Sequence, residues 1–184
     1  DTAMFVKLSQ GKVKIDRELE ARLYRRTWET LEENGYVQYE TSNFARAGHA
    51  CRHNLITWEM GAWIGYGPSA SSQWGARRWT NPSNLDQWIK GIEASQPVFE
   101  QVKDLSPADL LCDALVFGLR LNAGVDPYAL AARFDADLPQ GVSKLFADLI
   151  EEGLMELAGP NFRLTGEGRM RADAVGVAVL EKFD

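Results

Sequence analysis

Apolar residues recur at helical spacing in the first part of the chain, between a helix-starting and a helix-ending signal. The apolar positions are Leu19, Leu23, Tyr24, Trp28 and Leu31. Asp16 can cap such a helix and Asn34-Gly35 is a typical end, so the pattern predicts a helix up to about Glu33. Residues 36–41 then predict a strand. A helix, a glycine turn and a strand indicate an αβ unit, such as the last repeat of a parallel barrel.

The middle of the chain, residues 42–82, is irregular and rich in glycine, serine and aromatic residues. The expected elements are a short helix around residues 51–60, strands near residues 62–66 and 72–79, and a helix over residues 83–93. Loop regions of this length in a compact domain are usually functional or disordered. The aromatic and apolar content argues against disorder. Asn81-Pro82 closes the irregular region.

The last part of the chain has clear helix-starting signals. Ser106-Pro107 and Asp126-Pro127 each place a capping residue before a proline at the first helical position. The further expected elements are a helix over residues 140–152, a hairpin of residues 154–157 and 162–164 around Gly159-Pro160-Asn161, and a final helix from Thr165 to about residue 182. Three helices, a hairpin and a closing helix form a winged-helix-like order.

Composition divides the chain near residue 100. All six tryptophans lie between Trp28 and Trp88. Residues 1–104 carry 13 Lys/Arg and 13 Asp/Glu, whereas residues 105–184 carry 7 Lys/Arg and 13 Asp/Glu. We therefore expect an α+β protein with two domains, an aromatic and neutral one over residues 1–100 and an acidic, mostly helical, winged-helix-like one over residues 101–184.

Several protein classes are disfavoured by composition. No run of 18 apolar residues could span a membrane. Two cysteines are too few for a disulfide scaffold or an iron–sulfur cluster, and with no signal peptide they favour the cytoplasm. Nucleic-acid binding is disfavoured, because the candidate recognition helix carries Lys144 against three carboxylates and the wing offers only Arg163. The chain starts at Asp1 without a methionine, so we expect either a mature, processed chain or a piece of a longer protein.

The candidate chemistry lies in the irregular region. His53 is interpreted either as a hydrogen-bonded structural residue, the commoner case, or as a ligand of a metal or heme iron. Cys51 and His53 alone cannot complete a closed zinc site. Residues 65–72 lack the context of a dinucleotide fingerprint. They form either a plain turn or a place where small residues let the backbone approach a ligand.

One segment carries a specific family resemblance. The matching positions are Gly35-Tyr36, Tyr39-Glu40, Ser42 to Ala45, Gly48, Cys51, His53-Asn54 and Trp58. They resemble the pattern Gly-Tyr-x-x-Tyr-Glu-x-Ser-Asn-Phe-Ala-x-x-Gly-x-x-Cys-x-His-Asn-x-x-Tyr-Trp of the oxygen-independent coproporphyrinogen III oxidase family of radical S-adenosylmethionine (SAM) proteins. The HemW-like heme-chaperone branch is the more similar one. Thr57 replaces the tyrosine of this pattern.

A second element extends the resemblance over essentially the whole chain. The family's Gly-x-Gly-Pro-Gly-Ala-His-Ser is replaced here by Gly65-Tyr-Gly-Pro-Ser-Ala-Ser-Ser72, so the family's histidine is Ser71 and its ligand role is lost. The family's N-terminal half holds a [4Fe–4S] cluster on a Cys-x3-Cys-x2-Cys motif, which is absent from this sequence. The resemblance implies the terminal αβ unit of a partial radical-SAM barrel, followed by the domain that covers its open face.

The resemblance also implies site residues and a function. Gly67, Ser69, Ala70 and Ser71 would face S-adenosylmethionine, and His53, Asn54 and Trp58 would face heme or a porphyrin, with His53 as the candidate iron ligand. No catalytic residue is assigned, and the chain alone is not expected to be a catalyst. The expected function of the intact protein is heme binding and transfer to an accepting protein. The alternatives are oxidative decarboxylation of coproporphyrinogen III and a non-enzymatic lid that docks a partner protein.

Overall fold

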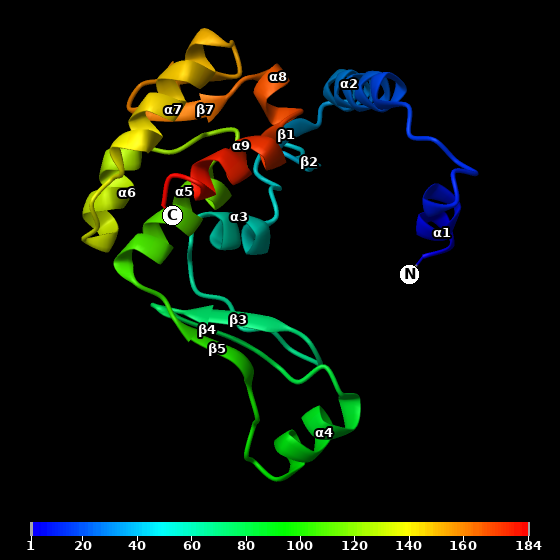
Figure 1. The fold of residues 1–184 in the computed structure, drawn as a ribbon, viewed down its shortest axis with the longest axis vertical. Coiled ribbons are helices and arrows are strands. Elements are labelled where there is room, and N and C mark those ends of the chain that lie inside the picture. Colours follow the sequence, from blue (N-terminus) through cyan, green and yellow to red (C-terminus); the bar gives the residue numbers. More distant parts are fainter. Residues whose placement is uncertain (1, 184) are drawn as a thin grey trace.

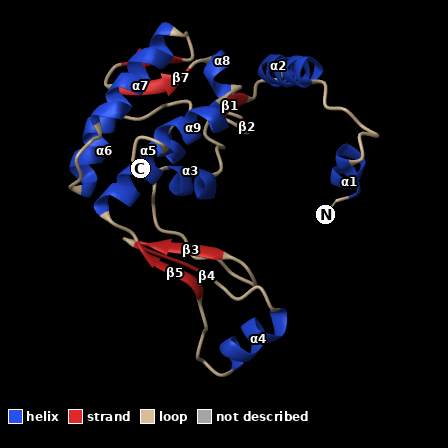
Figure 2. Cartoon of the chain, viewed as in Figure 1, coloured by secondary structure: helices blue, strands red, loops and turns tan. Residues whose placement is uncertain are grey.

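The computed structural model describes residues 2–183 as short helices and small antiparallel sheets (Figures 1 and 2). The helices are α1 (Ala3–Ser9), α2 (Arg17–Glu33), α3 (Arg52–Trp58), α4 (Leu85–Glu93), α5 (Pro107–Gly118), α6 (Pro127–Phe134), α7 (Gln140–Glu151), α8 (Gly166–Arg169) and α9 (Ala172–Leu180). The strands are β1 (Val37–Glu40), β2 (Asn43–Ala45), β3 (Ser71–Trp74), β4 (Arg77–Thr80), β5 (Glu100–Asp104), β6 (Met155–Ala158) and β7 (Asn161–Leu164). Within these residues β1 pairs with β2, β3 with β4 and β5, and β6 with β7.

The hydrophobic core lies in the C-terminal part, among α5, α7, α9 and the β6–β7 hairpin, which runs beside α7 in Figure 1. The most deeply buried core side chains are Leu111, Leu115, Val142, Phe146, Met155, Leu164 and Val179. The helix starts are those expected from the sequence. Ser106 caps α5 in a reciprocal capping box with Asp109, and the Asp126 carboxylate accepts from two amides at the start of α6. This part of the chain therefore has a hydrophobic core of its own.

The α+β class is confirmed. The finer description, a barrel edge followed by a winged-helix-like domain, stays a prediction. In the described residues β1 pairs antiparallel with β2, in a tight hairpin with an irregular register between Gln38 and Glu40. No described helix is long and apolar enough to cross a lipid bilayer.

Three expected elements differ in the structure. The strand expected over residues 62–66 is reduced to an isolated bridge between Trp63 and Gln73. The strand expected over residues 72–79 is the β3–β4 hairpin, because Gly75 turns the chain with a φ of 58°. The final helix is broken into α8 and α9 at Arg171, whose backbone N–H donates to the carbonyl of Gly168.

A second lobe, made of β3, β4, β5 and α4, extends away from the core at the bottom of Figure 1. It is joined to α5 by an ion pair between Arg78 and Asp113 at 2.8 Å. The amide of Leu105 also donates to the carbonyl of Ala76 at 2.7 Å, just before α5 begins. The lobe is therefore anchored at the end where β4 and β5 meet the helical core.

Strand β1 is bonded to the segment that follows α5. The Thr41 amide donates to the carbonyl of Arg120 at 2.9 Å, and the Asn122 amide donates to the carbonyl of Tyr39 at 3.1 Å. The side chain of Asn122 donates to the carbonyl of Gln38 at 2.7 Å. These bonds cross between the two parts of the chain that differ in composition, so backbone pairing unites them.

Candidate functional site

Helix α3 carries the residues predicted to face heme. It begins after Cys51, which makes no side-chain cap, and it ends before Met60, whose φ is 57°. His53 is exposed, and within residues 2–183 its imidazole has no hydrogen-bond partner. The hydroxyl of Thr57 donates back to the carbonyl of His53 at 3.0 Å, so only the backbone of His53 is engaged. The imidazole is therefore presented to solvent without a structural partner.

Asn54 and Trp58 lie one turn apart, on the face of α3 that meets the rest of the protein. The amide of Asn54 donates to the hydroxyl of Tyr39 at 3.4 Å. The indole of Trp58 packs edge-on against Phe117 at 5.7 Å, and the guanidinium of Arg120 lies 5.0 Å from its ring. The indole Nε1 is buried and has no partner among the described residues.

The structure therefore brings Asn54 and Trp58 together but not His53. At ~100° per residue, positions 53 and 58 point roughly 140° apart around a helix. Trp58 lines a cavity of about 330 Å³ with Gly118, Val125 and Leu130, and His53 is not part of its lining. A macrocycle bound at His53 would consequently lie on the exposed side of α3 and not in the cavity beside Trp58.

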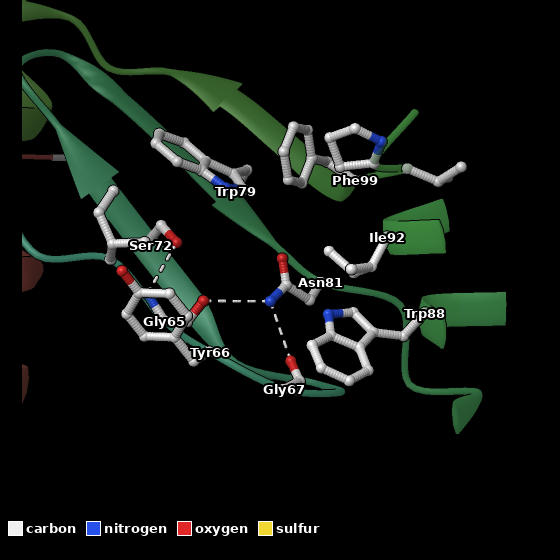
Figure 3. A pocket seen from close by; sticks show the side chains of 12 residues that line it. Gly65, Tyr66, Gly67, Ser72, Trp79, Asn81, Trp88, Ile92 and Phe99 are labelled. Carbon is white, nitrogen blue, oxygen red and sulfur yellow. Dashed lines mark hydrogen bonds between the residues drawn. The ribbon is translucent and has the colours of Figure 1, made fainter. Parts of the chain in front are cut away.

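The glycine-rich segment forms a tight turn held by Asn81 (Figure 3). The amide of Ala70 donates to the carbonyl of Gly67 at 3.4 Å, and the φ angles of Gly67 and Ser69 are 94° and 59°. The side-chain amide of Asn81 donates to the carbonyls of Gly65 at 3.1 Å and Gly67 at 2.9 Å. Sequence reasoning treated Asn81 only as the end of an irregular region, and its two bonds are long-range contacts that local pattern does not encode.

An apolar pocket of about 210 Å³ opens on one side of this turn (Figure 3). Its walls are Ile64, Gly65, Tyr66, Gly67, Ser72, Trp79, Asn81, Trp88, Ile92, Pro97, Val98 and Phe99. The aromatic walls other than Tyr66 were not singled out from the sequence, because they come from β4, α4 and the residue before β5. The pocket is too small for a macrocycle and is of a size for a single ring or a short apolar chain.

Only one of the four residues predicted to face SAM lines this pocket. Gly67 lines the pocket, but Ser69, Ala70 and Ser71 do not. The hydroxyl of Ser72 accepts from the Gly65 amide at 3.0 Å on the pocket side. Ser71 is exposed and shares a hydrogen bond of 3.1 Å with Thr80. Neighbouring side chains of a strand point to opposite faces, so Ser71 is directed away from the pocket.

The implied cofactors fit these residues unequally. Residues 2–183 contain no group of three or more His, Cys, Asp and Glu side chains that could hold a metal ion. Cys51 is exposed and Cys112 is buried in α5, so an iron–sulfur cluster does not fit these residues. A single exposed imidazole does fit one axial position of a heme iron.

Comparisons with known proteins agree with the sequence motifs. A family model of the HemN C-terminal domain matches residues 105–171. A heme chaperone HemW from Mycobacterium tuberculosis is 32% identical over 95% of this chain and 43% of its own length. The mitochondrial radical S-adenosyl methionine domain-containing protein 1 of Bos taurus is 30% identical over 99% of this chain and 44% of its own length. The heme chaperone HemW of Bacillus subtilis is 27% identical over 97% of this chain and 48% of its own length.

The fold has a counterpart among solved structures. Coproporphyrinogen III oxidase (HemN) from Escherichia coli, a radical SAM enzyme, matches with a TM-score of 0.69 and 18% identity, over 94% of this chain and 44% of that one. The chain thus spans less than half the length of these relatives. Residues 105–171 carry a HemN C-terminal domain, and nearly the whole chain is similar to HemW heme chaperones and radical SAM domain-containing proteins, as its motifs predicted.

Proposed function

We propose that this protein binds heme, with His53 as the iron ligand, and passes it to an accepting protein. The observation that carries the proposal is the exposed imidazole on α3, which has no hydrogen-bond partner within residues 2–183. A histidine with a structural role is normally held by such a partner. Neutral imidazole is a common axial ligand of heme iron. The name of the HemW relatives, heme chaperone, supports the same ligand.

The neighbouring residues have supporting roles in this proposal. Asn54 and Trp58 fix α3 against the core and so hold His53 at a defined place on the surface. Gly67, Ser69, Ala70 and Ser71 would approach S-adenosylmethionine in the intact protein, whose [4Fe–4S] cluster would be held by residues other than those of this chain. The radical SAM names of the relatives support these two cofactors. A chain with only two cysteines, one exposed and one buried, suits a reducing compartment, and we place the protein in the cytoplasm.

Two alternatives use other features of the chain. Coproporphyrinogen III oxidation is the alternative that the motif resemblance implies, and the match to HemN at 18% identity supports the fold alone. A lid that docks a partner protein is favoured by the acidic composition of residues 105–184, with 7 Lys/Arg against 13 Asp/Glu. In neither alternative does His53 need to bind iron.

A heme titration separates these functions. The chain contains two histidines, His49 and His53, both exposed, so His49→Ala is a matched control for His53→Ala. We expect wild type and His49→Ala to give the same saturable Soret band with ferric heme. His53→Ala should bind about tenfold or more weakly, because loss of one axial ligand removes the specific contact to iron.

The thiol beside His53 needs its own variant. Cys51 is exposed and lies two residues before His53, and a thiolate is also an axial ligand of heme. Cys51→Ser should leave the Soret band and the affinity unchanged. Equal heme binding by wild type and His53→Ala, or loss of the band in Cys51→Ser, contradicts the assignment of His53.

A further inference from the structure

A wide polar cleft lies between α2 and the junction of α8 and α9, and Arg120 is part of its lining. Its volume is about 500 Å³. It is closed by two contacts of α2 with α8: the Arg25–Glu167 ion pair at 2.9 Å, and the Arg169 guanidinium 5.5 Å from the Trp28 ring. Figure 1 shows α2 beside α8, with β1 entering between them and α9. The cleft is therefore framed by elements from both parts of the chain.

Arginines dominate the lining of this cleft. The charged lining residues are Arg17, Arg120, Arg169 and Arg171 against Glu20 and Asp173. These formal charges sum to 4 − 2 = +2, although the whole chain has a net charge of −6. Thr41 and Ser42 add hydroxyl groups to the same lining. A local positive excess on an acidic protein favours an anionic ligand at this place.

Two of these guanidinium groups are held in place and still have N–H groups without a hydrogen-bond partner among the described residues. Arg120 stacks on Trp58 and donates through Nη1 to Asp173 at 3.1 Å, while the Asp173 side chain is 95% exposed. Arg169 stacks on Trp28 and donates through Nη1 to the carbonyl of Leu164 at 3.3 Å. Neither Nη2 group has a hydrogen-bond partner within residues 2–183, and both Nε atoms are buried without one. Burial lowers the pKa of the Arg169 guanidinium, and the charge of Glu32 opposes that effect.

The start of α9 adds further donors to the same cleft. Ala172, Asp173 and Ala174 form its first turn and line the cleft, and the helix has no side-chain cap at Arg171. The amides of a first helical turn have no partner inside the helix and carry a partial positive charge. Uncapped amides beside a fixed guanidinium suit the oxygens of a carboxylate or a phosphate.

We infer that this cleft is a binding site for an oxyanion-bearing ligand, held by Arg120 and Arg169 with the first-turn amides of α9. The ligand is a carboxylate or a phosphate ester, the two groups that a guanidinium recognises with paired hydrogen bonds. The exposed carboxylate of Asp173 lies at the rim of the site and accepts one hydrogen bond from Arg120. The inference does not depend on heme, because His53 does not line this cleft.

The test is a titration of the full chain, labelled with nitrogen-15, followed by amide chemical shifts. Inorganic phosphate and propionate are added in separate experiments at constant ionic strength. We expect saturable shifts at Asp173, Ala174 and Ser42 with at least one anion, and the anion that acts identifies the chemical source. Arg169→Gln should weaken binding about tenfold, the effect of one charge-assisted hydrogen bond. Arg22→Gln, on α2 but outside the lining, should leave it unchanged.

Each remaining outcome has a defined meaning. Absence of saturable shifts at these amides with both anions in the wild-type chain overturns the inference without any variant. Equal weakening by Arg22→Gln and Arg169→Gln also overturns it, because it shows general charge attraction. If Arg169→Gln loses its dispersed spectrum, Arg17→Gln replaces it. Arg17 is exposed at the start of α2, and its removal should still weaken binding about twofold to threefold.

Discussion

In the glycine-rich turn, some positions require a positive φ and others leave no space for a Cβ. Ser69 has a φ of 59°, a region that favours glycine, at the position where the similar family pattern has glycine. Position 65 requires glycine for a steric reason, because a Cβ there would lie 2.4 Å from the carbonyl oxygen of Ser71. Gly67 has nothing within 4 Å of its Cβ position, and its φ of 94° alone explains the residue type.

Ser69→Gly should stabilise the protein. Relief of the left-handed conformation outweighs the added flexibility of the unfolded chain, so we expect a gain of about 0.5–1 kcal/mol in the free energy of unfolding, measured with urea. Ser71→Gly is the control, since Ser71 lies in β3 without a positive φ. It should lower stability by about 0.5–1 kcal/mol. A loss of stability in Ser69→Gly would show that the serine makes a compensating contact.

Among the elements, α5 has the most completely satisfied start. The Ser106 hydroxyl accepts from the Asp109 amide at 3.1 Å, and the Asp109 carboxylate accepts from the Ser106 amide at 2.9 Å and from Lys103 at 2.8 Å. The bonds from Lys103 and then Ser106 hold the pKa of the Asp109 carboxyl well below its ordinary value. The carboxylate therefore stabilises the folded state in its ionised form.

This pKa shift predicts a pH dependence. Because the folded-state pKa is depressed, the contribution of Asp109 is present above the unfolded pKa of ~4 and is lost as the pH falls below it. Asp109→Asn should be about 1 kcal/mol less stable than wild type at neutral pH, the scale of one helix cap. The difference should shrink steadily below about pH 4. Asp137→Asn, an exposed site, should show no such trend in the same urea series; a constant difference for Asp109→Asn contradicts the prediction.

The sequence could predict the elements whose signals are local. Ser106-Pro107, Asp126-Pro127 and Asp16 marked helix starts correctly, since caps act within one turn. The sequence could not predict β5, whose five residues lack an apolar alternation and which forms by pairing with β4. The break between α8 and α9 also depends on a distant contact. A Cβ at Gly168 would lie 1.8 Å from the carbonyl oxygen of Leu154, so α8 packs directly against the backbone that leads into the β6–β7 hairpin.

The candidate site shows the same limit. Motif spacing identified α3 and the glycine-rich turn, but not the direction of their side chains. Whether His53 faces solvent or the core depends on Phe117 and Arg120, which anchor Trp58 from more than fifty residues away. The arginine cleft was missed entirely, because Arg17, Arg120 and the run from Arg169 to Ala174 lie far apart in the sequence and become neighbours only through folding.

At the scale of the whole molecule, the lobe of β3, β4, β5 and α4 is joined to the helical core by the Leu105–Ala76 backbone bond and by the side chain of Arg78. Arg78 donates to Gln73 within the sheet and to Asp113 on α5 at 2.8 Å. Arg78 and Asp113 are 29% and 23% exposed, so the pair is largely shielded from water. A shielded, hydrogen-bonded pair is costly to break by removal of one partner.

Asp113→Ala should uncouple the two lobes. Four of the six tryptophans, Trp63, Trp74, Trp79 and Trp88, lie in this lobe or pair with its strand β3, so fluorescence mainly reports the lobe, whereas far-ultraviolet circular dichroism is dominated by the helical core. Wild type should show coincident urea transitions by both probes. In Asp113→Ala the fluorescence transition should have a lower urea midpoint, which corresponds to a loss of about 1–3 kcal/mol in the free energy of unfolding of the lobe. Asp148→Ala, exposed on α7, is the control. Transitions that shift together would show that the lobes unfold as one unit regardless of this pair.

The bonds between β1 and the segment after α5 restrict how this domain can be exchanged in evolution. A recombination breakpoint at residue 104 would deliver the HemN C-terminal domain without the strand that Arg120 and Asn122 bind. Each orphaned backbone or amide group would cost about 1–3 kcal/mol unless water reached it. A transplantable module therefore begins before β1, so the domain and β1 should be inherited together.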